Sequence, residues 1–463
     1  MKKFREGESR GQLSLLPRSI EEYVPADDLV RYVDTLVGEF DLSAIERCYS
    51  VRGRPAYSPC LLIKVLLYGK MRGIRSGREL AQACRENLRF IFLCRSEKPD
   101  FRTINDFRKC HSERLAGLLR QTIQIGLKEG FIDLKQVCID GTKLAASAGR
   151  RSFKTPEKIK EELDALEEDL KKSFEADNLS DKKEDEKFGE DDDGDRKLPR
   201  EFRTKAELAE RLRRALKEHE NSERKEKPEA ISTTDPESRM MKGKGVNPSY
   251  NAQAAIDAKS RMAVGGYVVN ACCDSSELIP LVDSVNANAG KHPELVSADK
   301  GYTRLEHLAT LETRGIDGYI SQRARRKQEF TYDEAQDVYV CPEGKVLTRT
   351  AKTTLQIFYT TEACGDCSRK PNCWRKNSSR ATVCVSAKEE VAHRMRIKTR
   401  TEMGKQISRL RASTIEPLFG TIKFAKRFRQ FTVRGLKRVD EVWKLELAAY
   451  NLEKLCRVRR ALA

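Results

Sequence analysis

Helical patterning dominates the first 130 residues of the chain. Pro59 stands behind a serine that can cap a helix, and a long apolar run follows it. Ser76 and Glu79 have the spacing of a capping box at the start of a second helix. Recurring apolar residues predict a third helix from Asp100 to about Lys128. We therefore expect an all-helical N-terminal domain over residues 1–130.

Short apolar runs that end in an aspartate appear after residue 130. Val137 to Ile139 lead directly into Asp140, a pattern typical of a buried strand with a carboxylate at or near its end. Because an ionised carboxylate is costly to bury without a cation or a hydrogen-bond donor, Asp140 is a candidate active-site acid. A strand that ends in an Asp-Gly turn is the alternative interpretation. The same pattern recurs at Asp299, at the end of a second short apolar run.

Strands and helices follow one another over most of the remaining chain, from residue 131 to residue 463. Two strand-like segments joined by a short link predict a β-hairpin, and helices and strands alternate after it. This order predicts an α/β domain with a mixed sheet. The strand-like segments are 137–142, 250–257, 262–269, 294–298 and 318–321, and the helices between them are 276–289 and 304–314.

Two segments with a different composition interrupt that domain. Residues 150–235 are highly charged, and leucines at helical spacing lie on both sides of an acidic run, which predicts an antiparallel helical hairpin. Residues 329–390 break into short strands and turns that carry cysteines. A Cys-two-residues-Cys pair with two further cysteines is a candidate structural zinc site, and free cysteines are the alternative. The four candidate ligands are Cys341, Cys364, Cys367 and Cys373.

The charge of the chain predicts its partner. The 463 residues carry a formal net charge of +18, which favours a polyanion such as nucleic acid. Between Val391 and Ala463, 19 lysines and arginines stand against 6 aspartates and glutamates, so most of the polyanion contact is expected there. Arg78 and other arginines between the short N-terminal helices also suit a DNA-binding module. A helical packing domain with a solvated basic face is the alternative for that region.

The chain has no pattern that predicts export or a membrane. No run of 18 apolar residues occurs, so we expect no membrane span. No apolar stretch follows the charged N-terminus, so we expect no signal peptide and a cytoplasmic protein.

Four stretches taken together resemble the signature of the DDE transposases of bacterial insertion sequences, which have a ribonuclease H-like core. The helical segment 58–109 also looks like the domain that precedes the catalytic core in that family. Each motif is weak alone, but the four in this order are specific. The matching stretches are 139–143, 298–302, 414–423 and 447–452.

The resemblance implies a set of catalytic and DNA-binding residues. Asp140, Asp299 and Glu416 would be the catalytic acids, and Lys423 matches the lysine that follows the glutamate in the family. Many relatives carry an arginine four positions before the glutamate, where this chain has Ala412. Arg411 lies one step earlier. The candidate DNA contacts are Lys423, Lys426, Arg427, Arg429, Arg411 and Arg78.

The resemblance also implies a reaction. Two Mg²⁺ or Mn²⁺ ions held by three carboxylates could activate a water and stabilise the leaving oxygen of a phosphodiester. The substrates would be the terminal inverted repeats of an element and a target DNA, bound by a homodimer. Two alternatives stay open, namely a DNA-binding protein derived from a transposase and a two-metal nuclease without strand transfer.

Overall fold

A computed structural model of the chain describes residues 19–50, 55–188, 200–221, 229–243, 245–322, 330–333, 336–353, 356–364, 367, 381–386 and 389–463. The chain divides into two compact units. One consists of residues up to 122 together with 424–427 and 444–463, and the other consists of 123–423 with 428–443. This division differs from the predicted boundary at residue 130, because two C-terminal segments group with the N-terminal helices.

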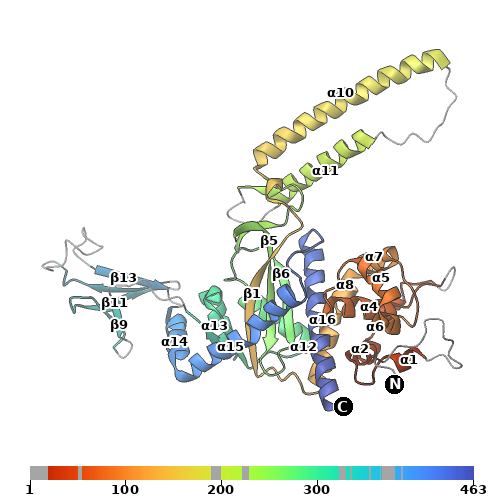
Figure 1. The fold of residues 1–463 in the computed structure, drawn as a ribbon. Coiled ribbons are helices and arrows are strands. Elements are labelled where there is room, and N and C mark those ends of the chain that lie inside the picture. Colours follow the sequence, from red (N-terminus) through yellow and green to blue (C-terminus); the bar gives the residue numbers. More distant parts are fainter. Residues whose placement is uncertain are drawn as a thin grey trace, which may run out of the picture. The chain divides into compact units, whose positions relative to one another are not determined.

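The first unit is helical, as its apolar spacing predicts. Helices begin at Pro59 and Gly77 as expected, but the side chains of Ser58 and Ser76 accept no capping hydrogen bond. The predicted third helix is three helices, since the chain breaks at His111 and at Gly117. The helices of this part of the chain are α1 (Ile20–Tyr23), α2 (Leu29–Gly38), α3 (Ser43–Glu46), α4 (Pro59–Met71), α5 (Gly77–Glu86), α6 (Leu88–Leu93), α7 (Phe101–Cys110), α8 (Ser112–Ala116) and α9 (Leu118–Lys128) (Figure 1).

A mixed sheet forms the centre of the second unit. Its strand order is β4-β5-β1-β7-β8, and β6 also pairs with β5. β1 is antiparallel to β5 and parallel to β7, which is in turn parallel to β8. The predicted α/β class and mixed sheet are therefore confirmed. The strands are β1 (Gln136–Ala145), β4 (Arg239–Gly243), β5 (Gly245–Asp257), β6 (Ala263–Val269), β7 (Leu295–Ala298) and β8 (Asp317–Ile320).

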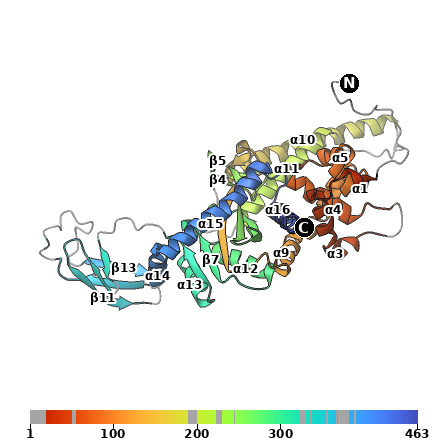
Figure 2. The same cartoon turned by 60° about the horizontal axis from the view of Figure 1, so that its bottom comes forward.

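Helices cover this sheet. α15 (Glu402–Gly420) lies against β1 and β7, and both views show it beside β1 (Figures 1 and 2). α12 (Leu278–Ala289) packs on β5 and β6. Most of their buried side chains are apolar, including the fully buried Leu281 and Ile415. The other helices along this part of the chain are α13 (Leu305–Thr313), α14 (Glu389–Arg400) and α16 (Leu436–Leu462).

Both predicted insertions form elements of their own. α10 (Pro156–Phe188) and α11 (Arg200–Glu220) make the helical hairpin, closed at its base by β2 (Phe153–Lys154) and β3 (Ile231–Ser232). A small core that includes Ile159 and Leu212 joins the two helices. The cysteine-containing segment is an antiparallel sheet of β9 (Thr331–Asp333), β10 (Val338–Val340), β11 (Val346–Lys352), β12 (Gln356–Thr361) and β13 (Ala381–Ser386). None of the described helices combines the length and the apolar character that a membrane span requires.

Candidate active site

Asp140 and Asp299 lie side by side where the parallel pairing of the interior strands β1 and β7 ends, a place called the sheet edge below. The last paired residues of the parallel strands β1 and β7 are Ile139 and Ala298, so each aspartate is the next residue of its strand. Parallel strands in this register present neighbouring side chains on the same face. The two predicted acids, 159 positions apart in the sequence, are thus brought together by the pairing of the two strands.

The Asp140 carboxylate lies in a half-buried, negatively charged environment. Its Oδ1 accepts a hydrogen bond from the Gly141 amide at 2.8 Å, and its Oδ2 accepts one from Arg411 Nη1 at 3.1 Å. The pKa of Asp140 is raised to about 6, chiefly by burial and also by the nearby charge of Asp299, while the Gly141 amide and the Arg411 guanidinium oppose the rise. A divalent cation at this edge would relieve the repulsion between the two carboxylates.

Asp299 is fixed by the turn that follows β7. It caps a short 3-10 turn, η2 (Lys300–Tyr302), and its Oδ1 accepts a hydrogen bond from the Gly301 amide at 2.7 Å. Tyr302 of this turn is fully buried. The carboxylate is therefore held on a rigid segment, as a metal ligand or a catalytic acid requires.

α15 and the turn after it supply cations to the same edge. Arg411 pairs with Asp140, and its Nε is buried without a hydrogen-bond partner among the described residues. Lys423 lies in a π-helical turn, η4 (Thr421–Ala425), and its Nζ donates to Thr142 Oγ1 at 2.5 Å and to the Lys143 carbonyl at 3.0 Å. Burial lowers the pKa of Lys423. Its ammonium is thus anchored to β1 two residues beyond Asp140.

Glu416 lies on α15 with an exposed side chain. No group of three or more His, Cys, Asp or Glu side chains that could hold a metal ion occurs among the described residues. The structure therefore brings together Asp140, Asp299 and Arg411, but it does not gather Glu416 into a three-carboxylate cluster with them. The α-helix that carries Glu416 ends at Gly420, and Lys423 lies in the π-helical turn that follows it, so the two residues are not on one regular α-helix.

Comparison with known protein families identifies both ends of the chain. Residues 18–110 match a family described as a transposase domain (DUF772), and residues 340–456 match a family described as a transposase DDE domain. No curated protein matches the chain. The order of the two domains agrees with the predicted resemblance.

The chain belongs to the DDE transposases of insertion sequences. A DDE domain implies phosphoryl transfer on DNA and a ribonuclease H-like core, and the mixed sheet agrees with this. The matched DDE segment includes Glu416 and Lys423 but lies outside β1 and β7. The proposal that Asp140 and Asp299 are catalytic residues of this transposase consequently depends on the pairing of β1 with β7, which places them side by side.

The structure separates the predicted DNA-binding residues of the transposase into exposed and buried groups. Arg78, Arg427 and Arg429 are exposed. Lys426 is buried, its Nζ lies 2.8 Å from Glu453 Oε2, and its carbonyl accepts hydrogen bonds from Arg75. Lys426 therefore stabilises the first unit, and its predicted contact with DNA is wrong because the side chain faces inward.

The zinc hypothesis remains a prediction. Cys341 and Cys364 pack against the apolar core of the β9–β13 sheet, and Cys341 Sγ accepts a hydrogen bond from the Lys345 amide at 3.3 Å. Cys367 is half-buried, and Cys373 lies outside the described residues. Metal analysis of the transposase purified without chelators tests the hypothesis, because a structural site would retain about one zinc ion per chain.

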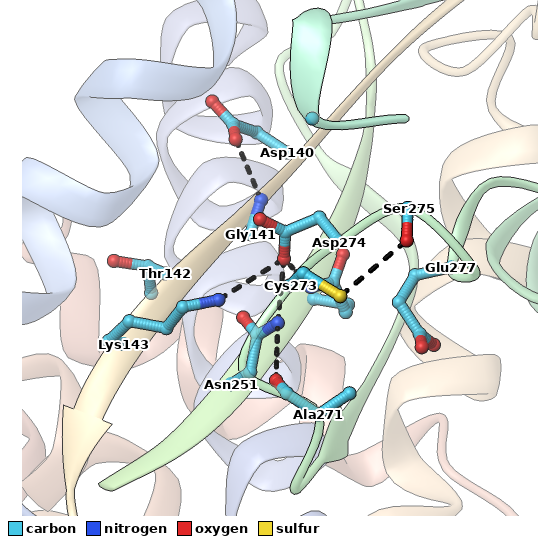
Figure 3. A network of polar contacts seen from close by, with 12 residues as sticks. Asp140, Gly141, Thr142, Lys143, Asn251, Ala271, Cys273, Asp274, Ser275 and Glu277 are labelled. Atoms are coloured by element: carbon cyan, nitrogen blue, oxygen red, sulfur yellow. Dashed lines mark hydrogen bonds and ion pairs between the residues drawn. The ribbon is translucent and has the colours of Figure 1, made fainter. Parts of the chain in front are cut away.

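The sequence analysis missed a fourth acid near the sheet edge. Asp274 lies in the loop between β6 and α12, and Figure 3 shows Lys143 and Asn251 pointing toward its carboxylate. Ala271, Cys272 and Cys273 lead into Asp274, but Asn270 separates them from the apolar run of β6, and the acid was not singled out. Its hydrogen-bond donors come from β1 and β5, whose pairing places them together.

Proposed function

We propose that this transposase binds the ends of its insertion sequence as a homodimer and catalyses divalent-metal-dependent strand cleavage and strand transfer. The observation that carries the proposal is the juxtaposition of Asp140 and Asp299 at one sheet edge beneath α15. In this proposal Glu416, on the same helix as Arg411, is the third acid and approaches the pair when DNA and metal are bound. Asp140 and Asp299 supply the hard carboxylate oxygens that Mg²⁺ or Mn²⁺ prefers.

The side chains around the acid pair have separate tasks in this reaction. Bound divalent ions would activate the attacking water and stabilise the leaving oxygen of the phosphodiester. Arg411 neutralises Asp140 before DNA binds. Lys423 holds β1 in place through the Thr142 hydroxyl and the Lys143 carbonyl, and it keeps a positive charge beside the scissile phosphate.

A cationic cavity along α15 is the proposed path of the DNA. It has a volume of about 730 Å³ and lies between β8, β9, α14 and the first half of α15. Arg396, Arg400, Lys405 and Arg409 line it, and none of its described lining residues is acidic. Arg409 is two positions before Arg411 on α15, about 200° away around the helix, so the cavity lies close to the acid pair along the helix but on another face. We infer that it binds the phosphate backbone next to the cleavage site.

Removing this charge should lower the salt dependence of DNA binding. Each neutralised phosphate contributes a slope of about 0.9 to the dependence of log K on log salt. The triple variant Arg400→Ala, Lys405→Ala, Arg409→Ala should therefore reduce the slope by about 2 to 3. Fluorescence anisotropy measures this slope when a duplex that carries an end of the element is titrated over a range of salt concentrations.

The matched control removes three lysines near the start of β1, at the end of the strand away from the cavity and the acid pair. Lys135, Lys259 and Lys291 gather there, where Lys259 and Lys291 donate to the carbonyls of Gly130 and Asp133. Replacing all three by alanine changes the net charge equally and should leave the slope near that of the unmodified protein. Equal slopes for the two triple variants would show that the cavity is not a phosphate site.

A further inference from the structure

Asp274 contacts the central sheet from the face opposite to Asp140. Gly141 pairs with Gln253 and Lys143 pairs with Asn251 across β1 and β5. Residues directly opposite each other in an antiparallel pair share a face, and successive residues of one strand alternate between faces. Asp140 therefore points toward α15, while Gly141 and Lys143 face the loop that carries Asp274.

One oxygen of Asp274 collects donors from two neighbouring strands. Its Oδ1 accepts hydrogen bonds from Asn251 Nδ2 at 2.6 Å, from Gln253 Nε2 at 2.8 Å and from Lys143 Nζ at 3.3 Å. Asn251 and Gln253 are fully buried, and the Asp274 side chain is only 25% exposed. Figure 3 shows the side chains of Lys143 and Asn251 directed at the Asp274 carboxylate. The contact therefore links the loop directly to the strand of Asp140.

Gly141 lets this contact form. A Cβ atom at Gly141 would lie 2.5 Å from Gln253 Nε2 and 2.8 Å from Asp274 Oδ1, which is closer than real Cβ contacts. The residue after the candidate catalytic acid is thus a glycine because Asp274 and its donors fill the space that a side chain would need.

The same carboxylate reaches the turn that carries Asp299. A Cβ atom at Gly301 would lie 2.8 Å from Asp299 Oδ1, 3.5 Å from Asp274 Cβ and 3.6 Å from Asp274 Oδ2. Tyr302 of that turn donates to Gln253 Oε1 at 2.5 Å, so Gln253 bridges Tyr302 and Asp274. Burial raises the pKa of Tyr302, and the charges of Asp274, Asp140 and Asp299 act in the same direction, since all three carboxylates lie near this phenol.

We propose that Asp274 is a positioning residue of the active site, which holds the Asp140 strand and the Asp299 turn at the separation that a divalent cation requires. Its Oδ1 accepts from Lys143, Asn251 and Gln253 on β1 and β5, and Gln253 in turn accepts a hydrogen bond from Tyr302 of the Asp299 turn. The inference rests on the proposed function, because it assumes that Asp140 and Asp299 bind the metal.

The test measures Mn²⁺ binding to the full-length protein by electron paramagnetic resonance, together with thermal unfolding without metal. Asp274→Ala should weaken Mn²⁺ binding on the order of 10–100-fold, as loss of the support behind metal ligands usually does. Asp274→Asn should recover most of the affinity, because its side-chain oxygen can still accept from Asn251 and Gln253. The rate of strand cleavage should likewise be highest in the unmodified protein, lower in Asp274→Asn and lowest in Asp274→Ala.

The matched control is Asp257→Asn. Asp257 lies on β5 at the far end of the same sheet, is fully buried and accepts from the amides of Leu134 and Ser260. This change should lower thermal stability without changing Mn²⁺ affinity, so it separates a structural effect from a positioning effect.

Three results would overturn one claim each. Wild-type affinity for Mn²⁺ in folded Asp274→Ala would overturn the positioning role. If Asp274→Ala does not fold, Gly141→Ala serves as the second variant, because its methyl group pushes Asp274 away from β1. Unchanged Mn²⁺ binding by Gly141→Ala would also overturn the positioning role of Asp274. Absence of Mn²⁺ binding by the unmodified protein would instead contradict the proposed metal site of Asp140 and Asp299.

Discussion

Asp140→Asn, Asp299→Asn and Glu416→Gln should each lower strand cleavage by at least about a thousandfold, which corresponds to roughly 4 kcal/mol of transition-state stabilisation. Each change removes a carboxylate that the proposed metal centre needs, while the basic surfaces that contact phosphates are unchanged. DNA binding should therefore stay within a few-fold of that of the unmodified protein. Single-turnover cleavage of a labelled element end, with anisotropy for binding, measures both quantities.

The third acid needs its own control, since the structure leaves Glu416 exposed and apart from the aspartates. Glu402 is another exposed glutamate of α15, paired with Lys405 at 3.4 Å, and Glu402→Gln should retain cleavage. An active Glu416→Gln enzyme would remove Glu416 from the proposed centre, and Glu402 would then be the next candidate. Activity in Asp140→Asn or Asp299→Asn would contradict the acid pair itself.

Glu446→Gln should destabilise the first unit by about 3–5 kcal/mol. The Glu446 side chain is completely buried on α16, where its Oε1 lies 2.5 Å from Lys70 Nζ and also pairs with Arg75. Burial raises the pKa of Glu446, but the charges of Lys70 and Arg75 outweigh this effect and hold it below its usual value. Glutamine would leave the buried ammonium of Lys70 without a counter-charge, which is the costly outcome for a buried ion pair.

Urea unfolding measures this loss, and a surface pair provides the control. Glu39 pairs with Arg459 at 2.6 Å, but its side chain is 42% exposed. Glu39→Gln should therefore change the free energy of unfolding by no more than about 1 kcal/mol. A Glu446→Gln protein as stable as the Glu39→Gln protein would show that the buried cluster does not hold the C-terminal segment to the N-terminal helices.

The features that were predicted from sequence are those with a local signal. An apolar run that meets an aspartate singled out both acids, because burial and charge change abruptly within a few residues at Asp140 and Asp299. Only Asp299 stands at the end of its strand, since β1 continues beyond Asp140 to Ala145 along its pairing with β5. Apolar periodicity likewise predicted the helices of the first unit, the mixed sheet and the helical hairpin. The break of the third helix at His111 had no comparable signal.

The features that were missed depend on partners far away in the sequence. Lys426 seemed to be one of many basic surface residues, but Glu453, 27 positions later, draws it into the interior. Asp274 gained its donors from Lys143, 131 positions earlier, and from two residues of β5. The buried pair of Lys70 and Glu446 spans 376 positions. Such contacts follow from the tertiary fold, and charge counts cannot reveal them.

The most direct test of the account is cleavage of the element's own ends. The purified transposase is incubated with a duplex that carries a terminal inverted repeat and its flank, with Mg²⁺ or with EDTA, and a target DNA is added. The account predicts Mg²⁺-dependent cutting at the end of the repeat, followed by joining of that end to the target, and no reaction in EDTA. Binding without cutting in Mg²⁺ would contradict it, and cutting without joining would identify a nuclease instead.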